Sequence, residues 1–180
     1  MKNKILIVLG LLFMFVVSCG GKHPAVKAFE DDMKVLQSGD LNKSASSQNT
    51  LVDPETMKAF GEGYKKITYK INKTTTKGNE VTINVTMKAP DLTGLMEEYM
   101  HKAMSNAANF QNKSDEEMQK EGQKLLNEMI TQKLSDSNLK YIERTFDVVY
   151  KKSGDKWDMD LNTGKEYAEI ITLGMLNVKQ

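Results

Sequence analysis

Two stretches near the middle of the chain alternate apolar and polar residues with a period of two. Ile67, Tyr69 and Ile71 alternate with polar neighbours, and the apolar residues at positions 81, 83, 85 and 87 do the same after the letters TTTKGN. This alternation around a Gly-Asn turn predicts a β-hairpin. Because each predicted strand has one apolar and one polar face, we expect a sheet that is covered on one side only.

A second hairpin is predicted near the C-terminal end of the chain. Arg144 interrupts the apolar face of its first strand, and the turn-forming letters KKSGDK separate the two strands. The apolar residues of this hairpin are Ile142, Phe146, Val148, Tyr150, Trp157, Met159 and Leu161.

Elsewhere the apolar residues recur at spacings of three and four, which is typical of amphipathic helices. Pro24 suits a first helical position, with His23 as its cap, and Gly39 suits the position just after the helix end. Ser114 and Glu117 match a capping box. The expected helices cover residues 24–38, 53–60, 92–107, 114–134 and 164–176.

The predicted order is helix, helix, hairpin, two helices, hairpin, helix. Such an order favours the α+β class, with helices packed on one face of an antiparallel sheet and a helical pair inserted between two β-hairpins. Once residues 1–18 are removed, 162 residues remain, which is enough for one domain with its own core. We therefore expect a single α+β domain over residues 24–180, preceded by a short tether at 19–23.

The first eighteen residues have the layout of an export signal. Lys2 and Lys4 precede an apolar run from Ile5 to Val17, which small residues follow. As a helix the run spans roughly 20 Å, which is less than the ~30 Å of a bilayer core. A permanent transmembrane helix therefore fits less well than a cleaved signal peptide.

The signal ends on Cys19, which is the only cysteine of the chain. The letters VVSC at 16–19 resemble the lipobox of bacterial lipoproteins, although Val16 stands where that pattern usually has Leu. The resemblance implies cleavage between Ser18 and Cys19, a diacylglyceryl group on the Cys19 thiol, and an acylated amino terminus. It places the protein in the cell envelope: in the outer membrane if there are two membranes, otherwise on the outer face of the cell membrane. An ordinary exported protein with a chance cysteine is the alternative.

Composition excludes some roles of the mature chain. It holds 23 basic and 24 acidic residues with no basic block, which argues against nucleic acid as a partner and against electrostatic membrane binding. A lone cysteine can close no disulfide and makes a poor metal site. The covalent lipid on Cys19 is the one attached group that we expect, with no other cofactor.

The N-terminal helix that ends in QSGD, the first hairpin and the late SGDKWDMDL strand together resemble small bacterial lipoproteins of unknown function with an NTF2-like, cystatin-like domain. The resemblance covers residues 24–89 and 139–161. It implies helices packed against a curved antiparallel sheet, and Trp157 after Gly154 matches the Trp of that family's last hairpin. The helical pair at 91–138 departs from the pattern and puts a deep pocket in doubt.

The letters MEEYMHKAM at 96–104 are the most suggestive stretch for chemistry. Met96, Met100, His101 and Met104 could bind Cu(I), because thioether and imidazole ligands suit that ion. Met96 and Met100 also fall on the apolar stripe of their helix, and methionine readily fills irregular cores. We expect core packing there, with a metal site or a partner-binding face as the alternatives.

Carboxylate pairs and a pocket complete the candidates. The neighbouring acids Glu97 and Glu98 point in different directions on a helix, so their carboxylates do not converge on one reacting atom. Asp158 and Asp160 share one face of a strand, which is either a solvated face or a cation site. Arg144, Tyr150 and Trp157 are the residues that we expect to line any ligand pocket, and Arg144 could instead reach a carboxylate or a sheet edge.

No catalytic constellation is visible. The sequence favours a non-enzymatic module that binds an envelope component or a small apolar ligand; an NTF2-like hydrolase or isomerase is the alternative.

Overall fold

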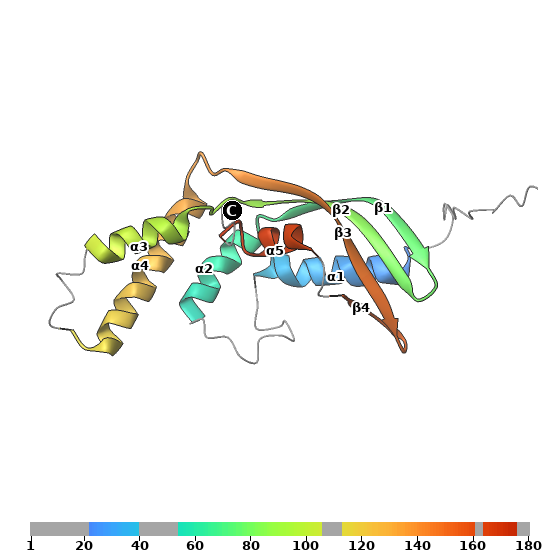
Figure 1. Cartoon of the computed structure of the whole chain (residues 1–180), viewed down its shortest axis with the longest axis horizontal. Helices are drawn as coiled ribbons and strands as arrows, with labels where there is room; N and C mark the ends of the chain where they lie inside the picture. Colours follow the sequence, from blue (N-terminus) through green and yellow to red (C-terminus); the bar gives the residue numbers. More distant parts are fainter. Residues whose placement is uncertain (1–21, 40–53, 106–112, 161–163, 176–180) are drawn as a thin grey trace, which may run out of the picture.

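The structure is a computed structural model that describes residues 22–39, 54–105, 113–160 and 164–175. The described chain is elongated, with a sheet along much of its length and a helical pair at one end (Figure 1). Its helices are α1 (Pro24–Ser38), α2 (Pro54–Tyr64), α3 (Leu95–Ser105), α4 (Asp115–Ser135) and α5 (Lys165–Ile171). Its strands are β1 (Thr68–Lys77), β2 (Glu80–Pro90), β3 (Tyr141–Ser153) and β4 (Lys156–Met159).

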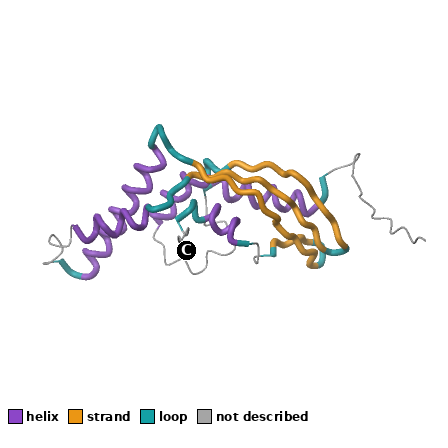
Figure 2. Tube along the Cα trace, turned by 45° about the horizontal axis from the view of Figure 1, so that its top comes forward, coloured by secondary structure: helices purple, strands orange, loops and turns teal. Residues whose placement is uncertain are grey.

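The four strands form one antiparallel sheet in the order β1-β2-β3-β4. Val81, Ile83 and Val85 of β2 pair with Tyr150, Val148 and Phe146 of β3, so the two predicted hairpins join through their apolar strands. Along β2 every inward residue from Val81 to Ala89 is fully buried, while the residues between them are partly or fully exposed. The prediction of a sheet covered on one face is confirmed. The strands bend together over the helices (Figure 2).

Strand β1 extends farther than its sequence suggested. The letters TTTKGN were expected to form the turn, but Thr74 to Lys77 continue the ladder, and only Gly78 and Asn79 turn. A bulge between Ile71 and Lys73 shifts the register within β1. After the bulge the residues of β1 are exposed.

Helix α1 begins and ends where its sequence predicts. The His23 Nδ1 atom accepts a hydrogen bond from the Ala25 amide at 3.2 Å, Pro24 is the first helical residue, and Gly39 adopts φ +70° just after the helix. Only glycine takes that backbone conformation at no steric cost. The helix buries Phe29 and Met33 against the sheet.

Helix α2 corrects one expectation. The letters GEG at 61–63 were expected to end it, but the helix continues through both glycines to Tyr64. The two glycines are buried, whereas Met57 and Phe60, which were expected to face inward, are only half-buried. A side chain at Gly61 would lie 2.6 Å from the Gly39 carbonyl oxygen. The glycines are thus contact points where helix α2 approaches its neighbours closely.

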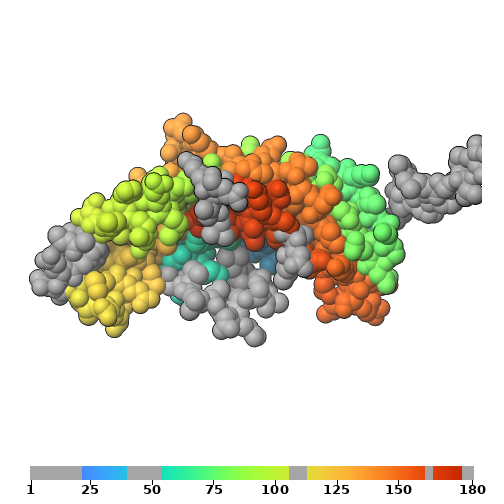
Figure 3. Space-filling view, viewed as in Figure 1, coloured from blue at the N-terminus to red at the C-terminus, as the bar shows by residue number. Residues whose placement is uncertain are grey.

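Helices α3 and α4 leave the sheet as a pair and extend beyond it (Figure 3). The capping box at the start of α4 is confirmed: the Ser114 hydroxyl accepts from the Glu117 amide, and the Glu117 carboxylate accepts from the Ser114 amide. The start of α3 is later than expected, because Asp91 accepts from the Thr93 amide in a turn that precedes Leu95. The pair packs at its base through Leu95, Met129, Ile130 and Leu134.

The described elements confirm an α+β arrangement with helices packed against an antiparallel sheet. The last helix is shorter than expected and ends at Ile171, while Leu173 beyond it is still fully buried. In the described ranges no helix combines the length and the apolar character needed to cross a membrane. The predicted signal peptide, the tether residues 19–21, Ala107 and Leu161 lie outside the described residues.

Candidate functional site

The covered face of the sheet holds a partly buried hydrogen bond between a buried phenol and a carboxylate at the edge of the core. Tyr150 of β3 is fully buried, and its hydroxyl donates to Oδ2 of Asp32 on α1 at 2.5 Å. The Phe29 ring packs edge-on against the rings of Tyr69 and Tyr150, with centroid distances of 5.2 and 6.4 Å. The α1 periodicity that buries Phe29 also sets Asp32 beside Tyr150.

Burial changes the acidity of this cluster. The pKa of Tyr150 is raised, first by burial and then by its hydrogen bond to Asp32. Burial of the carboxyl also raises the pKa of Asp32, although the hydrogen bond from Tyr150 opposes this effect. Burial likewise raises the pKa of Tyr167 on α5. A carboxyl that holds its proton more tightly is suited to general acid-base chemistry, and it is equally suited to satisfy a buried hydroxyl.

Arg144 lies on the covered face of β3 and binds a carboxylate. Its Nε and Nη2 atoms donate to the two carboxylate oxygens of Glu169 on α5, at 2.6 and 2.7 Å. Such a fork-shaped pair is both directional and strong. The contact fastens α5 to the sheet, which is one of the roles that the sequence left open for Arg144.

The three residues predicted to line a pocket do not meet. Arg144 and Tyr150 are six residues apart on one strand, which separates them by about 20 Å. Trp157 is a residue of β4, and its ring contacts the His23 ring edge-on, with a centroid distance of 5.1 Å. Arg144 is therefore remote from the other two, and the polar cluster of this face consists of Tyr150, Asp32 and Tyr167. The sequence did not indicate Asp32, because it lies on the polar side of the α1 pattern.

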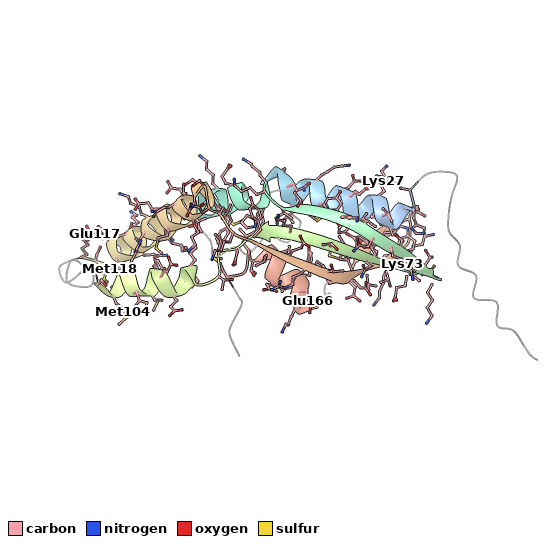
Figure 4. The ribbon with its side chains drawn as sticks, turned by 90° about the horizontal axis from the view of Figure 1, so that it is seen from above. Lys27, Lys73, Met104, Glu117, Met118 and Glu166 are labelled. Atoms are coloured by element: carbon pink, nitrogen blue, oxygen red, sulfur yellow. The ribbon has the colours of Figure 1, made fainter. Side chains whose placement is uncertain are left out.

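The methionines of α3 face solvent. The exposed fractions of Met96, Met100 and Met104 are 41, 55 and 70 %, and that of Met118 at the start of α4 is 37 %. We call these four residues the methionine ridge; Figure 4 shows Met104 of α3 and Met118 of α4 at the same end of the molecule. The expectation of core packing for Met96 and Met100 is wrong. The helical pair projects beyond the sheet, and none of the helices and strands that the structure describes covers this part of its apolar stripe.

The ridge is an apolar surface of flexible, polarizable side chains. Thioethers of this kind adapt to partners of different shape and are common at protein-binding surfaces. His101 beside them is exposed. Among the described residues no group of three or more His, Cys, Asp or Glu side chains is placed to hold a metal ion, and Asp160 instead bonds to Lys151 at 2.6 Å.

An open groove of about 520 Å³ between α2 and α4 was not predicted from the sequence. In its wall the Thr56 hydroxyl donates to Asn127 Oδ1 at 2.6 Å, while the buried Asn127 Nδ2 has no hydrogen-bond partner within the described part of the chain. The groove is shallow, and side chains of polar residues line it. The signal for it is a row of polar residues at helical spacing: Lys124, Asn127, Glu128, Thr131, Gln132 and Ser135, with Glu55 opposite.

No protein-family model matches the chain, and no curated protein matches it. Among solved structures it is similar to the crystal structure, at 2.62 Å resolution, of a "putative lipoprotein (ycdA)" from Bacillus subtilis subsp. subtilis str. 168. The two are 20 % identical with a TM-score of 0.46, and the match covers 83 % of this chain and 47 % of the other. The chain thus spans about half the length of the protein it resembles.

Proposed function

We propose that this chain is a lipid-anchored protein of the bacterial cell envelope whose α+β domain is a non-catalytic binding module. The methionine ridge is the surface that receives the partner, which is another envelope protein. The observation that carries the proposal is the exposure of four methionines on one projecting helical pair. Apolar side chains gathered on a surface favour association, because each gains free energy when a partner removes it from water.

The anchor rests on the sequence around Cys19 and on the place where the folded chain begins. Helix α1 starts at Pro24, five residues after Cys19, so a lipid on that cysteine would hold the domain close to the bilayer. Each buried methylene contributes about 0.8 kcal/mol, and two or more acyl chains hold a protein stably. Because neutral Gly20 follows the cysteine, the outer membrane is the proposed location in a cell with two membranes, and the outer face of the cell membrane otherwise.

The finer fold assignment is also a proposal. Helix α1 lies against the covered face of a four-stranded antiparallel sheet, which supports an NTF2-like, cystatin-like arrangement. The pair of helices between β2 and β3 is an addition to that arrangement. In this view the compact part serves as the platform, and the added pair carries the binding surface.

Replacing Cys19 by Ser tests the anchor. The account expects an uncleaved, unlipidated precursor in Cys19→Ser cells, seen as a mass increase and as loss of the acyl groups in mass spectrometry. Cys19 is the only thiol, so the comparison has no second modification site. Normal maturation of the variant would refute the lipid anchor and leave the binding surface to be judged separately.

Photocrosslinking in living cells tests the binding surface. A photoreactive residue at position 104 should give one defined protein adduct, which Met96→Gln combined with Met100→Gln should weaken. A photoreactive residue at Thr75, which is exposed on β1, is the matched control and should not give that adduct. The same adduct from both positions, or none from position 104, would contradict the role of the ridge.

One observation favours the alternative, a hydrolase or isomerase. Asp32 combines a raised pKa with a hydrogen bond to a buried phenol, which is a common setting for a general acid or base. A panel of ester and ketosteroid-type substrates tests this alternative with the wild type and with Asp32→Asn. Turnover that depends on Asp32 would establish the enzyme; turnover equal in both proteins, or absent from both, would count against it.

A further inference from the structure

Strand β1 is an edge strand of the sheet and carries lysines at positions 70, 73 and 77. Residues 65–77 contain five lysines and no acidic residue, although the mature chain as a whole is nearly neutral. Lys70, Lys73 and Lys77 pair in register with Thr86, Asn84 and Glu80, which places all three on the solvated face of the sheet. We call these three residues the lysine row.

The lysines of the row are not held in ion pairs within the described structure, and all three are exposed. The neighbours of the row on β2 are Thr86 and Asn84. Both accept a hydrogen bond from Asn72, and both also form a hydrogen bond with a residue of β3. Two acidic side chains lie near the row on the same face: Glu80, opposite Lys77, and Asp147 of β3, one strand beyond the Asn84 that pairs with Lys73. Two other lysines of the sheet are engaged: Lys88 lies over the Tyr141 ring, and Lys151 binds Asp160.

The row ends where the anchored end of the chain enters the fold. His23 contacts Trp157, Trp157 pairs with Lys152, and the Lys152 amide donates to the Asn79 carbonyl at 2.8 Å. Asn79 lies two residues after Lys77. Figure 4 shows Lys27 of α1 and Lys73 at this same end of the molecule, away from Met104 and Met118.

The tether is too short to separate the row from a membrane. From Cys19 to Lys22 the chain spans at most about 10 Å, and the row itself runs about 23 Å along the strand. A lipid on Cys19 would therefore bring the end of β1 within reach of the headgroups. A lysine close to an anionic bilayer is attracted to it, and this attraction fades within a Debye length.

We propose that the lysine row lies on the anionic phosphates of the bilayer that holds the anchor, so that β1 faces the membrane. This inference rests on the proposed lipid anchor. It changes the conclusion drawn from overall charge: a neutral total argues against electrostatic membrane binding only when the charges are evenly spread, and here the lysines are concentrated on one edge. The simpler role of such lysines, to prevent strand pairing at a sheet edge, requires no membrane.

Amine labelling of the mature lipoprotein on vesicles tests the row. Vesicles of phosphatidylcholine alone are compared with vesicles that also contain phosphatidylglycerol, and mass spectrometry measures the labelling rate of each lysine. We expect Lys70, Lys73 and Lys77 to be labelled several-fold more slowly on the anionic vesicles, and high salt to remove the difference. Lys120 and Lys124 of α4, with 72 and 77 % exposed side chains, should be labelled equally on both.

Fluorescence of Trp157, the only tryptophan, gives a second readout. A headgroup spin label should quench Trp157 more strongly on anionic than on neutral vesicles. The triple variant Lys70→Gln, Lys73→Gln, Lys77→Gln should lose this difference. The matched variant Lys102→Gln, Lys120→Gln, Lys124→Gln changes the charge equally on the helical pair and should keep it.

The outcomes separate the two proposals. A protein that does not float with neutral vesicles would refute the lipid anchor. A protein that floats, but whose row is labelled at the same rate on both vesicle types, would refute the row alone and leave edge protection as its role. Protection of the row by soluble polyphosphate, without protection on anionic vesicles, would likewise overturn the membrane assignment.

Discussion

The sheet and the projecting helical pair carry the same kind of signal, apolar residues at regular spacing, with opposite results. In β2 each inward side chain is buried, because α1 and α5 cover that face. In α3 Leu95 is buried and Tyr99 is partly buried against the core, whereas Met96, Met100 and Met104 are exposed. Periodicity therefore tells which face of an element is apolar, but not whether the molecule itself supplies the layer that covers it.

The difference follows from how the chain fills its layers. Helices α1, α2 and α5 occupy the covered face of the sheet. The α3–α4 pair joins the rest of the molecule through its base and through α2, whose Thr56 bonds to Asn127 of α4. Beyond the base the two helices contact each other, with the Tyr99 hydroxyl against Gly122 and Lys133 bonded to Glu98 at 3.1 Å. Two helices alone cannot bury a wide apolar stripe.

The largest test of this contrast is a matched pair of truncations. Phe29→Ala removes a fully buried ring that touches two tyrosines and should lower the free energy of unfolding by about 3–5 kcal/mol. Met100→Ala should change it by less than about 0.5 kcal/mol, because the side chain is already in water. Urea unfolding followed by circular dichroism measures both. Equal losses would show that Met100 is packed and that the contrast is wrong.

A second test uses glycine in the two regions. In Gly61→Ala the new methyl group would meet the Gly39 carbonyl oxygen, which is backbone and cannot move, so we expect a loss of about 1–3 kcal/mol. In Gly122→Ala it would meet only the Tyr99 hydroxyl, at the end of a side chain that can turn away. Alanine is the better helix former by up to about 1 kcal/mol, so thermal unfolding should show a small gain there. Two changes of the same sign and size would contradict the account.

Much of the fold was predictable, because the hairpins, the Ser114 capping box and Gly39 are signalled by local residues. The features that the sequence did not indicate depend on contacts between residues that are far apart in the chain. The GEG letters resemble a break, yet Gly61 serves a close approach to Gly39, which is remote in sequence. Asp32 lies on the polar side of α1, and only the register of β3 shows that Tyr150 reaches it. Met100 is exposed because none of the described elements packs over that side of α3, and no pattern within α3 records this.

A smaller effect concerns pH and the packed region. Because burial raises the pKa of Asp32 above its ordinary value of 3.8, the folded protein binds this proton more tightly than the unfolded chain does. The stability contributed by Asp32 is complete below that ordinary value and is lost as the pH rises through the raised one. Wild type should therefore lose stability relative to Asp32→Asn between pH 4 and pH 7, as urea unfolding at both values would show. A difference that is constant with pH, or that has the opposite sign, would contradict the partial burial of this carboxyl beside Tyr150.

Oxidation of the methionines tests the central claim, that the ridge is uncovered in the isolated protein and covered by a partner in the cell. Peroxide converts accessible methionines to sulfoxides, and mass spectrometry gives the rate at each position. In the purified lipoprotein the four ridge methionines should react faster than Met33, Met87 and Met129, which are at most 4 % exposed. In intact cells the ridge should become protected while those three stay unchanged. Ridge methionines that react in cells as fast as in the purified protein would contradict the account.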